Sequence, residues 1–157
     1  MCPVYINRIA SIHAESRNEK PYFSAQEPDY KEMITNANLR RRMSRMIKMG
    51  VACGLECLKD IPSEKVDAII TATGLGCLAD TEKFMNALMD NREQMLNPTA
   101  FIQSTFNTVG AQLALLLKIH AYNVTYVHRW LSFESALIDG IISIAEGKQH
   151  VLAGAMD

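Results

Sequence analysis

Apolar residues along this chain form short runs, separated by longer stripes that have helical spacing. An apolar, β-branched stretch at residues 4–12 predicts an opening strand. The polar segment at residues 15–30 contains two prolines and predicts a loop. In residues 38–61 apolar and small side chains recur with the period of an α-helix. Its buried face carries Gly50, Cys53 and Gly54, so we expect this helix to approach a sheet closely.

The middle of the chain continues with a strand and two helices. Residues 66–72 form a short, nearly continuous apolar run, as expected for a strand buried on both faces. A glycine-rich turn at residues 73–76 follows, and Asp80 is expected to cap the next helix. The second helix, at residues 104–119, is apolar around almost its whole circumference. It should therefore be buried on most sides, which requires layers on both sides of it.

The last part of the chain repeats the alternation of strand and helix. Residues 123–129 predict a strand, Ser132 opens a helix that Gly147 closes, and a final strand begins at His150. Strands alternating with helices predict an α/β fold with a parallel or mixed sheet. Because the most apolar helix needs two covering layers, we expect residues 1–157 to be the first portion of a larger fold.

Composition narrows the classes of partner. The 157 residues are 48% hydrophobic and 21% charged, which is typical of a globular protein. A formal net charge of -1 provides no basic field, so we expect neither nucleic acid nor a membrane as partner. The N-terminus lacks the pattern of a signal peptide, and no apolar run reaches the roughly 20 residues that span a bilayer. These features predict a cytoplasmic protein with reduced cysteines.

Neither a metal nor a cofactor is expected. The four cysteines, Cys2, Cys53, Cys57 and Cys77, do not have the paired spacing of a zinc site. Cys53 and Cys57 lie one helical turn apart, where core packing is the favoured interpretation. The turn at residues 73–76 lacks the third glycine of a dinucleotide loop and the Gly-Lys pair of a P-loop, so it is weak evidence for nucleotide binding.

Four stretches resemble β-ketoacyl-acyl carrier protein synthases, in the same order and with similar spacing. They are residues 41–46 (RRMSRM), the turn at 73–77 (TGLGC), the segment 97–107 (NPTAFIQSTFN), and the strand, turn, helix and strand at 123–154. The resemblance covers about residues 39–157 and is nearest to cysteine-less ketosynthase-like and chain-length-factor proteins of aryl-polyene or flexirubin-type clusters. It implies the N-terminal portion of a thiolase-like layered fold, with a mixed, mostly parallel sheet and a buried central helix.

In ketosynthases the nucleophilic cysteine lies in the sharp turn between the first strand and the helix of the fourth stretch. A thiolate there is stabilised by the N-terminus of the helix, which lowers its pKa. Counting back from Gly147 without a gap places this cysteine at Trp130, whose indole cannot carry an acyl thioester. Trp130 is instead expected to fill space at a buried turn.

Two other residues are weak candidates for the missing nucleophile. Ser132 lies two residues after Trp130, but a helix N-cap is the favoured interpretation of its hydroxyl. Cys77 lies in the glycine-rich turn, where reactive thiols can occur. The resemblance places the catalytic histidine pair in the second half of the fold. This chain is therefore not expected to condense acyl groups.

Three functions stay open at this point. The first is a non-condensing homologue that pairs with an active ketosynthase. The second is an acyltransferase or malonyl decarboxylase that works without the cysteine. The third is a stand-alone binding domain with no acyl chemistry.

The resemblance also implies two kinds of partner. An acidic acyl carrier protein would dock on a basic cluster, although a solvated helix end is an alternative interpretation; the cluster comprises Arg41, Arg42, Arg45 and Lys48. A homodimer, or a heterodimer with a ketosynthase, would form through the strand before the nucleophile turn. The predicted interface residues are Asn123, Val124, Thr125, Tyr126 and Val127.

Overall fold

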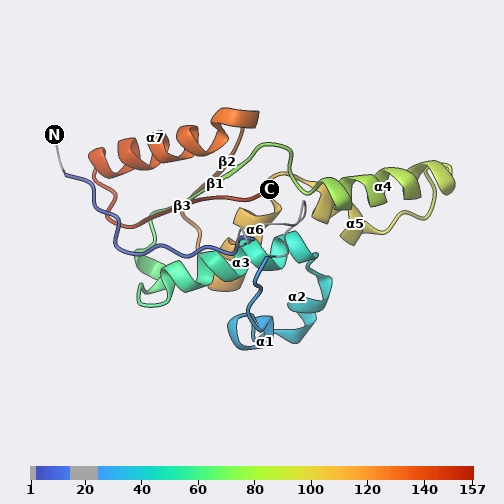
Figure 1. Ribbon diagram of the computed structural model, residues 1–157, viewed down its shortest axis with the longest axis horizontal. Helices are drawn as coiled ribbons and strands as arrows, with labels where there is room; N and C mark the ends of the chain where they lie inside the picture. The colour runs from blue at the N-terminus through green and yellow to red at the C-terminus, as the bar shows by residue number, and fades with distance from the viewer. Residues whose placement is uncertain (1–2, 15–24) are drawn as a thin grey trace, which may run out of the picture.

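A three-stranded parallel sheet forms the centre of the protein (Figure 1). The computed structural model describes residues 3–14 and 25–157. The strands are β1 (Ala68–Thr73), β2 (Tyr122–Val127) and β3 (Val151–Ala155), in the order β2-β1-β3. Both neighbours run parallel to β1, with Ala68 opposite Tyr122 on one side and Val151 on the other. The predicted α/β class is confirmed.

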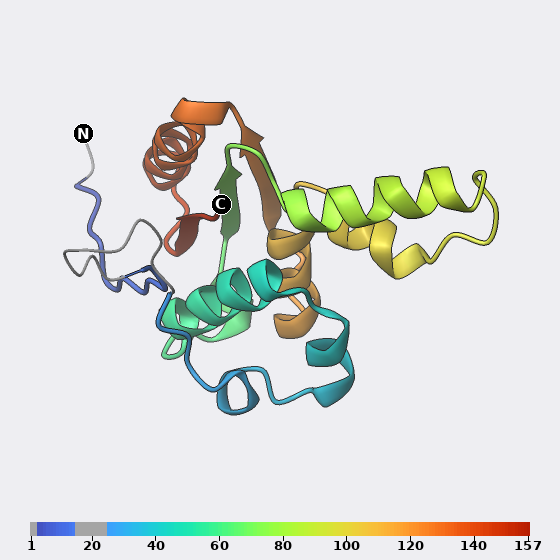
Figure 2. The same cartoon turned by 45° about the vertical axis from the view of Figure 1, so that its right-hand side comes forward.

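Helices cover both faces of the sheet (Figure 2). Helix α7 (Ser132–Ala145) packs on one face, while α3 (Arg45–Leu58) and α6 (Thr108–Leu117) pack on the other. Helices α4 (Leu78–Asp90) and α5 (Pro98–Ser104) form an arm that extends away from this body. The remaining elements are α1 (Tyr30–Met33), α2 (Ala37–Arg42) and the short helices η1 (Ser63–Lys65) and η2 (Arg129–Leu131).

The central strand β1 explains why residues 66–72 are almost continuously apolar. All six residues of β1 are buried, because helices cover both of its faces. Ala68, Ile70 and Ala72 pack with Ala136 of α7. Ile69 belongs to the larger apolar core that α3 and α6 share. Successive residues of the strand therefore serve opposite layers.

The small residues of α3 do permit a close approach, chiefly to α6 and, at Gly50, also to Met156 directly after β3. A Cβ added to Gly50 would lie 2.8 Å from Val109 Cγ1, and one added to Gly54 would lie 2.6 Å from Leu113 Cδ1. The predicted single helix at 38–61 is also wrong in its first part. The chain becomes extended at Met43 and α3 starts again after Ser44, so α2 and α3 are separate helices.

The predicted strand at residues 4–12 does not form. Within residues 3–14 the only β pairing is an isolated bridge between Ala14 and Ala25. Arg8 instead holds this segment along α3, where it pairs with Asp60 and donates to the Glu56 carbonyl at 3.1 Å. A strand needs a neighbouring strand, and the apolar pattern alone does not provide one. Of the loop predicted at 15–30, residues 15–24 lie outside the described part, and Tyr30 begins α1.

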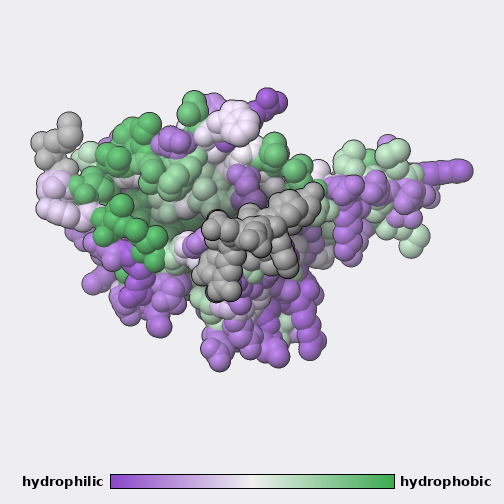
Figure 3. All heavy atoms as spheres, viewed as in Figure 1, coloured by the Kyte–Doolittle hydropathy of each residue, from purple (hydrophilic) through white to green (hydrophobic). Residues whose placement is uncertain are grey.

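The helix predicted at residues 104–119 forms as α6, which begins later, at Thr108; the preceding helix α5 was not predicted, and the two helices meet at 109°. The predicted burial of α6 is only partly correct, because Val109 and Leu113 are buried whereas Leu115 is 69% exposed. The helix that carries an open apolar face is α7, on which Ile138 and Ile141 are each more than half exposed. Figure 3 shows hydrophobic side chains gathered over this helix.

Among the described residues no single helix has the length and apolar character to cross a membrane. The bent pair α5 and α6 passes that test jointly, by length and composition.

Candidate functional site

The turn between β2 and α7 is sharp and backbone-strained. β2 ends at Val127, η2 follows, and α7 begins at Ser132. Arg129 has φ 51°, in the left-handed region that non-glycine residues seldom adopt. We call residues 128–132 the elbow. Strain of this kind persists only where surrounding contacts fix it, and two sets of contacts do so here.

The first set of contacts comes from Ser132. Its hydroxyl accepts a hydrogen bond from the His128 backbone N–H at 2.7 Å and donates one to the Arg129 carbonyl at 2.9 Å. The residue is 3% exposed. The prediction that Ser132 caps α7 is wrong, since Leu131 is the N-cap and Ser132 already has helical angles. Because η2 runs directly into α7, the hydroxyl holds the turn before the helix.

The second set of contacts comes from the glycine-rich loop, residues 73–76. A Cβ added to Gly74 would lie 3.2 Å from the Arg129 carbonyl oxygen, so the loop backbone touches the elbow. The loop is itself held by the Asp157 carboxylate, which accepts hydrogen bonds from Thr73 Oγ1 at 2.7 Å and from the backbone N–H of Gly74 at 2.9 Å. Leu75 N–H donates to the same carboxylate at 3.2 Å.

Sequence reasoning missed Asp157. The carboxyl ends of parallel strands meet at one edge of a sheet, and here the end of β3 meets the loop after β1. The position of Asp157 at the end of a strand therefore indicates a site residue only when β1 and β3 are known to be neighbours.

Trp130 stands at the tip of the elbow and is 92% exposed. The described residues do not bury the indole, so the prediction that it fills space at a buried turn is not met within this chain. Leu131 beside it is 60% exposed. The elbow is thus an apolar projection that a rigid turn holds in place.

Cys77 lies at the start of α4 and is only 7% exposed. Burial, followed by the nearby Asp80 and Asp157 carboxylates, raises the pKa of its thiol. A raised pKa keeps the thiol protonated at neutral pH, which disfavours nucleophilic attack. The structure also corrects the cap prediction for this helix, because Cys77 is the N-cap and Asp80 lies in the first turn.

Strand β2, with the predicted interface residues 123–127, lies at an edge of the sheet. Two of its side chains are used internally: Asn123 Nδ2 donates to the Gly110 carbonyl at 3.0 Å, and Thr125 Oγ1 bonds Thr71 Oγ1 at 2.6 Å. The outer backbone edge is what β2 offers to a partner. A shallow hollow next to it is lined by Phe101 and Phe106 together with Asn123 and Thr125.

The predicted basic cluster is divided in the structure. Arg41 and Arg42 are exposed at the end of α2. Arg45 pairs with Glu27 at 2.6 Å, and Lys48 is half-buried. A hydrogen bond from Tyr30, and then the one from Arg45, lowers the pKa of Glu27.

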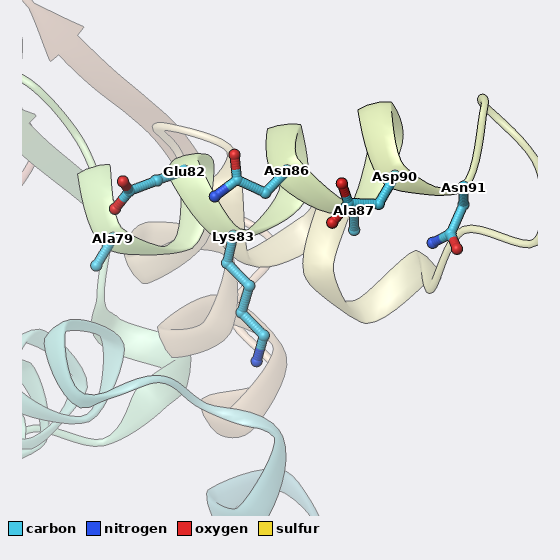
Figure 4. Close-up of a pocket in the computed structure, with 7 residues that line it drawn as sticks. All are labelled: Ala79, Glu82, Lys83, Asn86, Ala87, Asp90 and Asn91. Atoms are coloured by element: carbon cyan, nitrogen blue, oxygen red, sulfur yellow. The ribbon is translucent and has the colours of Figure 1, made fainter.

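Two further places carry polar or thiol side chains, namely a hollow along α4 and the cysteines of α3. A polar hollow runs along α4, and Glu82, Lys83 and Asp90 are among the residues that line it (Figure 4). Its lining residues all belong to α4 or follow it directly, so no second element converges on them. Among residues 3–14 and 25–157, no three His, Cys, Asp or Glu side chains gather as a metal site would require. Cys53 and Cys57 are half-buried thiols, and Cys2 lies outside the described residues.

Residues 14–157 match the sequence model of the β-ketoacyl synthase N-terminal domain. The chain belongs to this family. The resemblance seen in the sequence is thereby confirmed, including the thiolase-like class of fold. No curated protein matches the chain.

Several solved structures are similar to this chain. A chain of the ketosynthase ApeO in complex with its chain length factor ApeC, from Xenorhabdus doucetiae, is 23% identical with a TM-score of 0.66; the match covers 82% of this chain and 50% of that chain. A chain of the AntDE:AntF complex, a type II polyketide ketosynthase with its acyl-carrier protein, is 20% identical with a TM-score of 0.70, covering 83% and 39%. The ishigamide ketosynthase/chain length factor is 14% identical with a TM-score of 0.67, covering 81% and 37%.

At these identities the likeness shows the fold. The chain spans half or less of the length of these structures.

Proposed function

We propose that this chain is part of a non-condensing ketosynthase-like subunit of fatty-acid or polyketide-type biosynthesis, which pairs with an active ketosynthase as chain-length factors do. The observation that carries the proposal is Trp130 at the tip of the elbow, the position at which counting along the sequence places the family's cysteine. The two weak candidates do not replace it. The Ser132 hydroxyl is engaged with backbone atoms on both sides, and the Cys77 thiol is buried with a raised pKa.

The decisive experiment is intact-protein mass spectrometry of the full gene product after incubation with acyl- and malonyl-loaded carrier protein. We expect no covalent adduct and co-purification of a cysteine-bearing ketosynthase. An acyl adduct on this chain would refute the proposal. Release of carbon dioxide from the malonyl substrate would support the decarboxylase instead. A monomer that forms no adduct and binds no partner would support the stand-alone binding domain.

The Trp130→Cys variant tests whether the elbow has the geometry of a nucleophile turn. Its thiol would stand at the N-terminus of α7, where the helix dipole favours a thiolate. We expect thioester exchange with acyl-loaded carrier protein, in which the thiolate attacks the acyl carbonyl and the carrier thiol leaves. A Leu131→Cys variant is the matched control: Leu131 is the N-cap of α7 and has the same helix-dipole environment, but it is 60% exposed against 92% for Trp130, so we expect its thiol to exchange more slowly.

We further propose that the outer edge of β2 is the subunit interface, with the residues 123–127 pairing with a partner strand. An edge strand presents unpaired backbone N–H and C=O groups, which a second strand can satisfy. Val127, 41% exposed, is the position to test, because a lysine on an edge strand opposes such pairing. We expect Val127→Lys to lower the mass of the assembly in light scattering. Ala155→Lys, on the opposite edge strand β3, should leave it unchanged.

The open face of α7 supports a proposal about domain organisation. We propose that residues 1–157 form the N-terminal portion of the thiolase-like fold, whose C-terminal half covers this face. Four of its apolar side chains are between 39% and 58% exposed, namely Leu137, Ile138, Ile141 and Ile142. Exposed apolar faces of this kind mark interaction surfaces. Addition of the C-terminal half should protect the α7 amides from hydrogen exchange; unchanged protection would refute the covering.

Arg41 and Arg42, with Arg45 and Lys48, are proposed to dock an acidic acyl carrier protein. Arg41 and Arg42 are the residues to substitute, because their side chains are exposed. Complementary charge mainly speeds association and is weakened by salt. We expect the double variant Arg41→Glu, Arg42→Glu to lower the association rate at low ionic strength. Lys83→Glu on α4, the matched control, should not.

A further inference from the structure

Two carboxylates join β1 to β3, one at each end of the strand pair. Asp67, just before β1, accepts hydrogen bonds from the backbone N–H groups of Gln149 at 2.7 Å and His150 at 3.1 Å. Asp157, just after β3, accepts from the chain that leaves β1. The two residues therefore make the same kind of connection at opposite ends, but only one of the ends adjoins the elbow.

The Asp157 connection fixes the shape of the glycine-rich loop. Both carboxylate oxygens lie within hydrogen-bonding distance of Gly74 N–H, at 2.9 and 3.0 Å. One of them also accepts from Thr73 Oγ1, and that hydroxyl in turn accepts from Gly76 N–H at 2.8 Å. Consecutive N–H groups around one anion form a rigid nest. Asp157, just after the end of β3, therefore fixes the conformation of the loop.

The loop in turn supports the strained residue of the elbow. Gly74 has an added-Cβ distance of 3.2 Å to the Arg129 carbonyl oxygen and 3.3 Å to Asp157 Oδ2, so it is enclosed between the elbow and the carboxylate. Arg129 has the positive φ that the turn requires. A displacement of the loop would remove one of the two contacts that hold this turn.

We propose that Asp157 is a positioning residue for the elbow: through the loop at residues 73–76 it sets the direction in which Trp130 faces the partner. The role of Trp130 in facing a partner rests on the proposed function, whereas the positioning of the elbow by Asp157 does not. An asparagine reproduces it only in part, because its amide oxygen can replace Oδ1, but the negative charge is lost and an NH₂ group takes the place of Oδ2 beside Gly74 N–H.

The test is hydrogen exchange of the full chain, comparing Asp157→Asn with Asp67→Asn. Asp157→Asn should raise exchange about tenfold at residues 73–76 and 129–132. Asp67→Asn, which also removes a carboxylate held by two backbone N–H groups, should raise it only near residues 149–150. Equal effects of the two variants at the elbow would overturn the proposal. Trp130, the only tryptophan in the sequence, gives a second measurement, since its fluorescence anisotropy should fall in Asp157→Asn alone.

A second pair of variants tests the same contact without changing a charge. Gly74→Ala places a methyl group between the Arg129 carbonyl and the carboxylate and should also loosen the elbow. Gly154→Ala, where an added Cβ meets nothing within 4 Å, is its control. If the elbow loosens but ketosynthase binding is unaffected, the positioning role stands and the proposed partner role of Trp130 fails. If the elbow is unchanged in Asp157→Asn and Gly74→Ala, the positioning role fails whatever the partner does.

Discussion

Substituting alanine for Ser132 is the most direct test of how the elbow is held. The serine side chain is buried, and its hydroxyl bridges the His128 N–H and the Arg129 carbonyl across the positive-φ residue. Alanine removes both hydrogen bonds while adding no bulk. It leaves the His128 N–H without its acceptor, directly before the positive-φ residue Arg129.

The expected cost follows from these two bonds. A neutral hydrogen bond contributes about 1 kcal/mol net, and leaving a buried donor unpaired costs about 1–3 kcal/mol. We therefore expect the free energy of unfolding to fall by about 2 kcal/mol. The gain in helix propensity from serine to alanine, about 0.5 kcal/mol, offsets a small part of this loss.

Ser135→Ala is the matched control. Ser135 lies one turn further along α7, donates a hydrogen bond to the Leu131 carbonyl at 2.8 Å and makes a longer contact of 3.4 Å with His128 Nδ1, but it does not touch the Arg129 backbone as Ser132 does. The same change in propensity applies to both variants, so it cancels in their comparison. Ser135→Ala should change stability by less than about 0.5 kcal/mol, as is typical of partly exposed positions.

Urea denaturation, monitored separately by circular dichroism and by Trp130 fluorescence, gives the two free energies. Equal stability of the two variants would refute the reasoning that the hydroxyl holds the elbow. A different result would refute the proposed function: an acyl adduct that disappears in Ser132→Ala but persists in Ser135→Ala would identify Ser132 as an acyl acceptor.

The remaining predictions concern packing, acid stability and the contact between β2 and the segment that follows α7. Gly54→Ala should lower the free energy of unfolding by about 1–2 kcal/mol, because the cost of overpacking against Leu113 exceeds the gain in helix propensity. Adding Leu113→Val should restore part of the lost stability in a double-mutant cycle. Backbone hydrogen bonds, first from residue 149 and then from residue 150, lower the pKa of Asp67 in the folded chain. Its stabilisation is therefore present above the unfolded pKa and is lost as pH falls through the folded one, so Asp67→Asn should flatten the acid side of a stability–pH curve. Lys148→Met should cost about 0.5–1 kcal/mol in thermal unfolding, since its ammonium lies 4.4 Å from the Tyr122 ring centroid.

The three strands and α7 could be predicted from the sequence because their signals are local. Residues 66–72 are almost continuously apolar, and the sheet gives that run two covering layers as β1. The break between α5 and α6 was not predicted, since it depends on polar contacts inside an apolar stretch. Thr105 is extended there, and its hydroxyl bonds that of Thr108 at 2.7 Å. Hydroxyls that bond nearby backbone compete with the helix, but apolar periodicity does not record them.

The candidate site depended more strongly on topology. Counting along the sequence found Trp130 and Ser132, because the elbow is one continuous segment. Asp157 and Gly74 are more than 80 residues apart in number, and they meet only because β1 and β3 are parallel neighbours. No motif links them in the sequence.

Total apolar content predicted that residues 104–119, which contain α6, form the helix buried on most sides, whereas the helix with an open apolar face is α7. In α6 the buried residues Val109, Gly110 and Leu113 face α3 and the sheet, so this helix already has its partners on one side. In α7 the large side chains lie on the outer face instead. Small Ala136 and Gly140 face the sheet, and large aliphatic residues face outward.

A helix with only one covering layer would bury its large side chains and expose its polar ones. The reversed order in α7 costs apolar exposure that only a second layer can remove. This arrangement therefore favours the proposed covering of α7 by a second layer. In the sequence it is visible as small residues spaced four apart within an aliphatic helix. The relevant signal is thus how side-chain size is distributed around a helix, which total hydrophobicity cannot report.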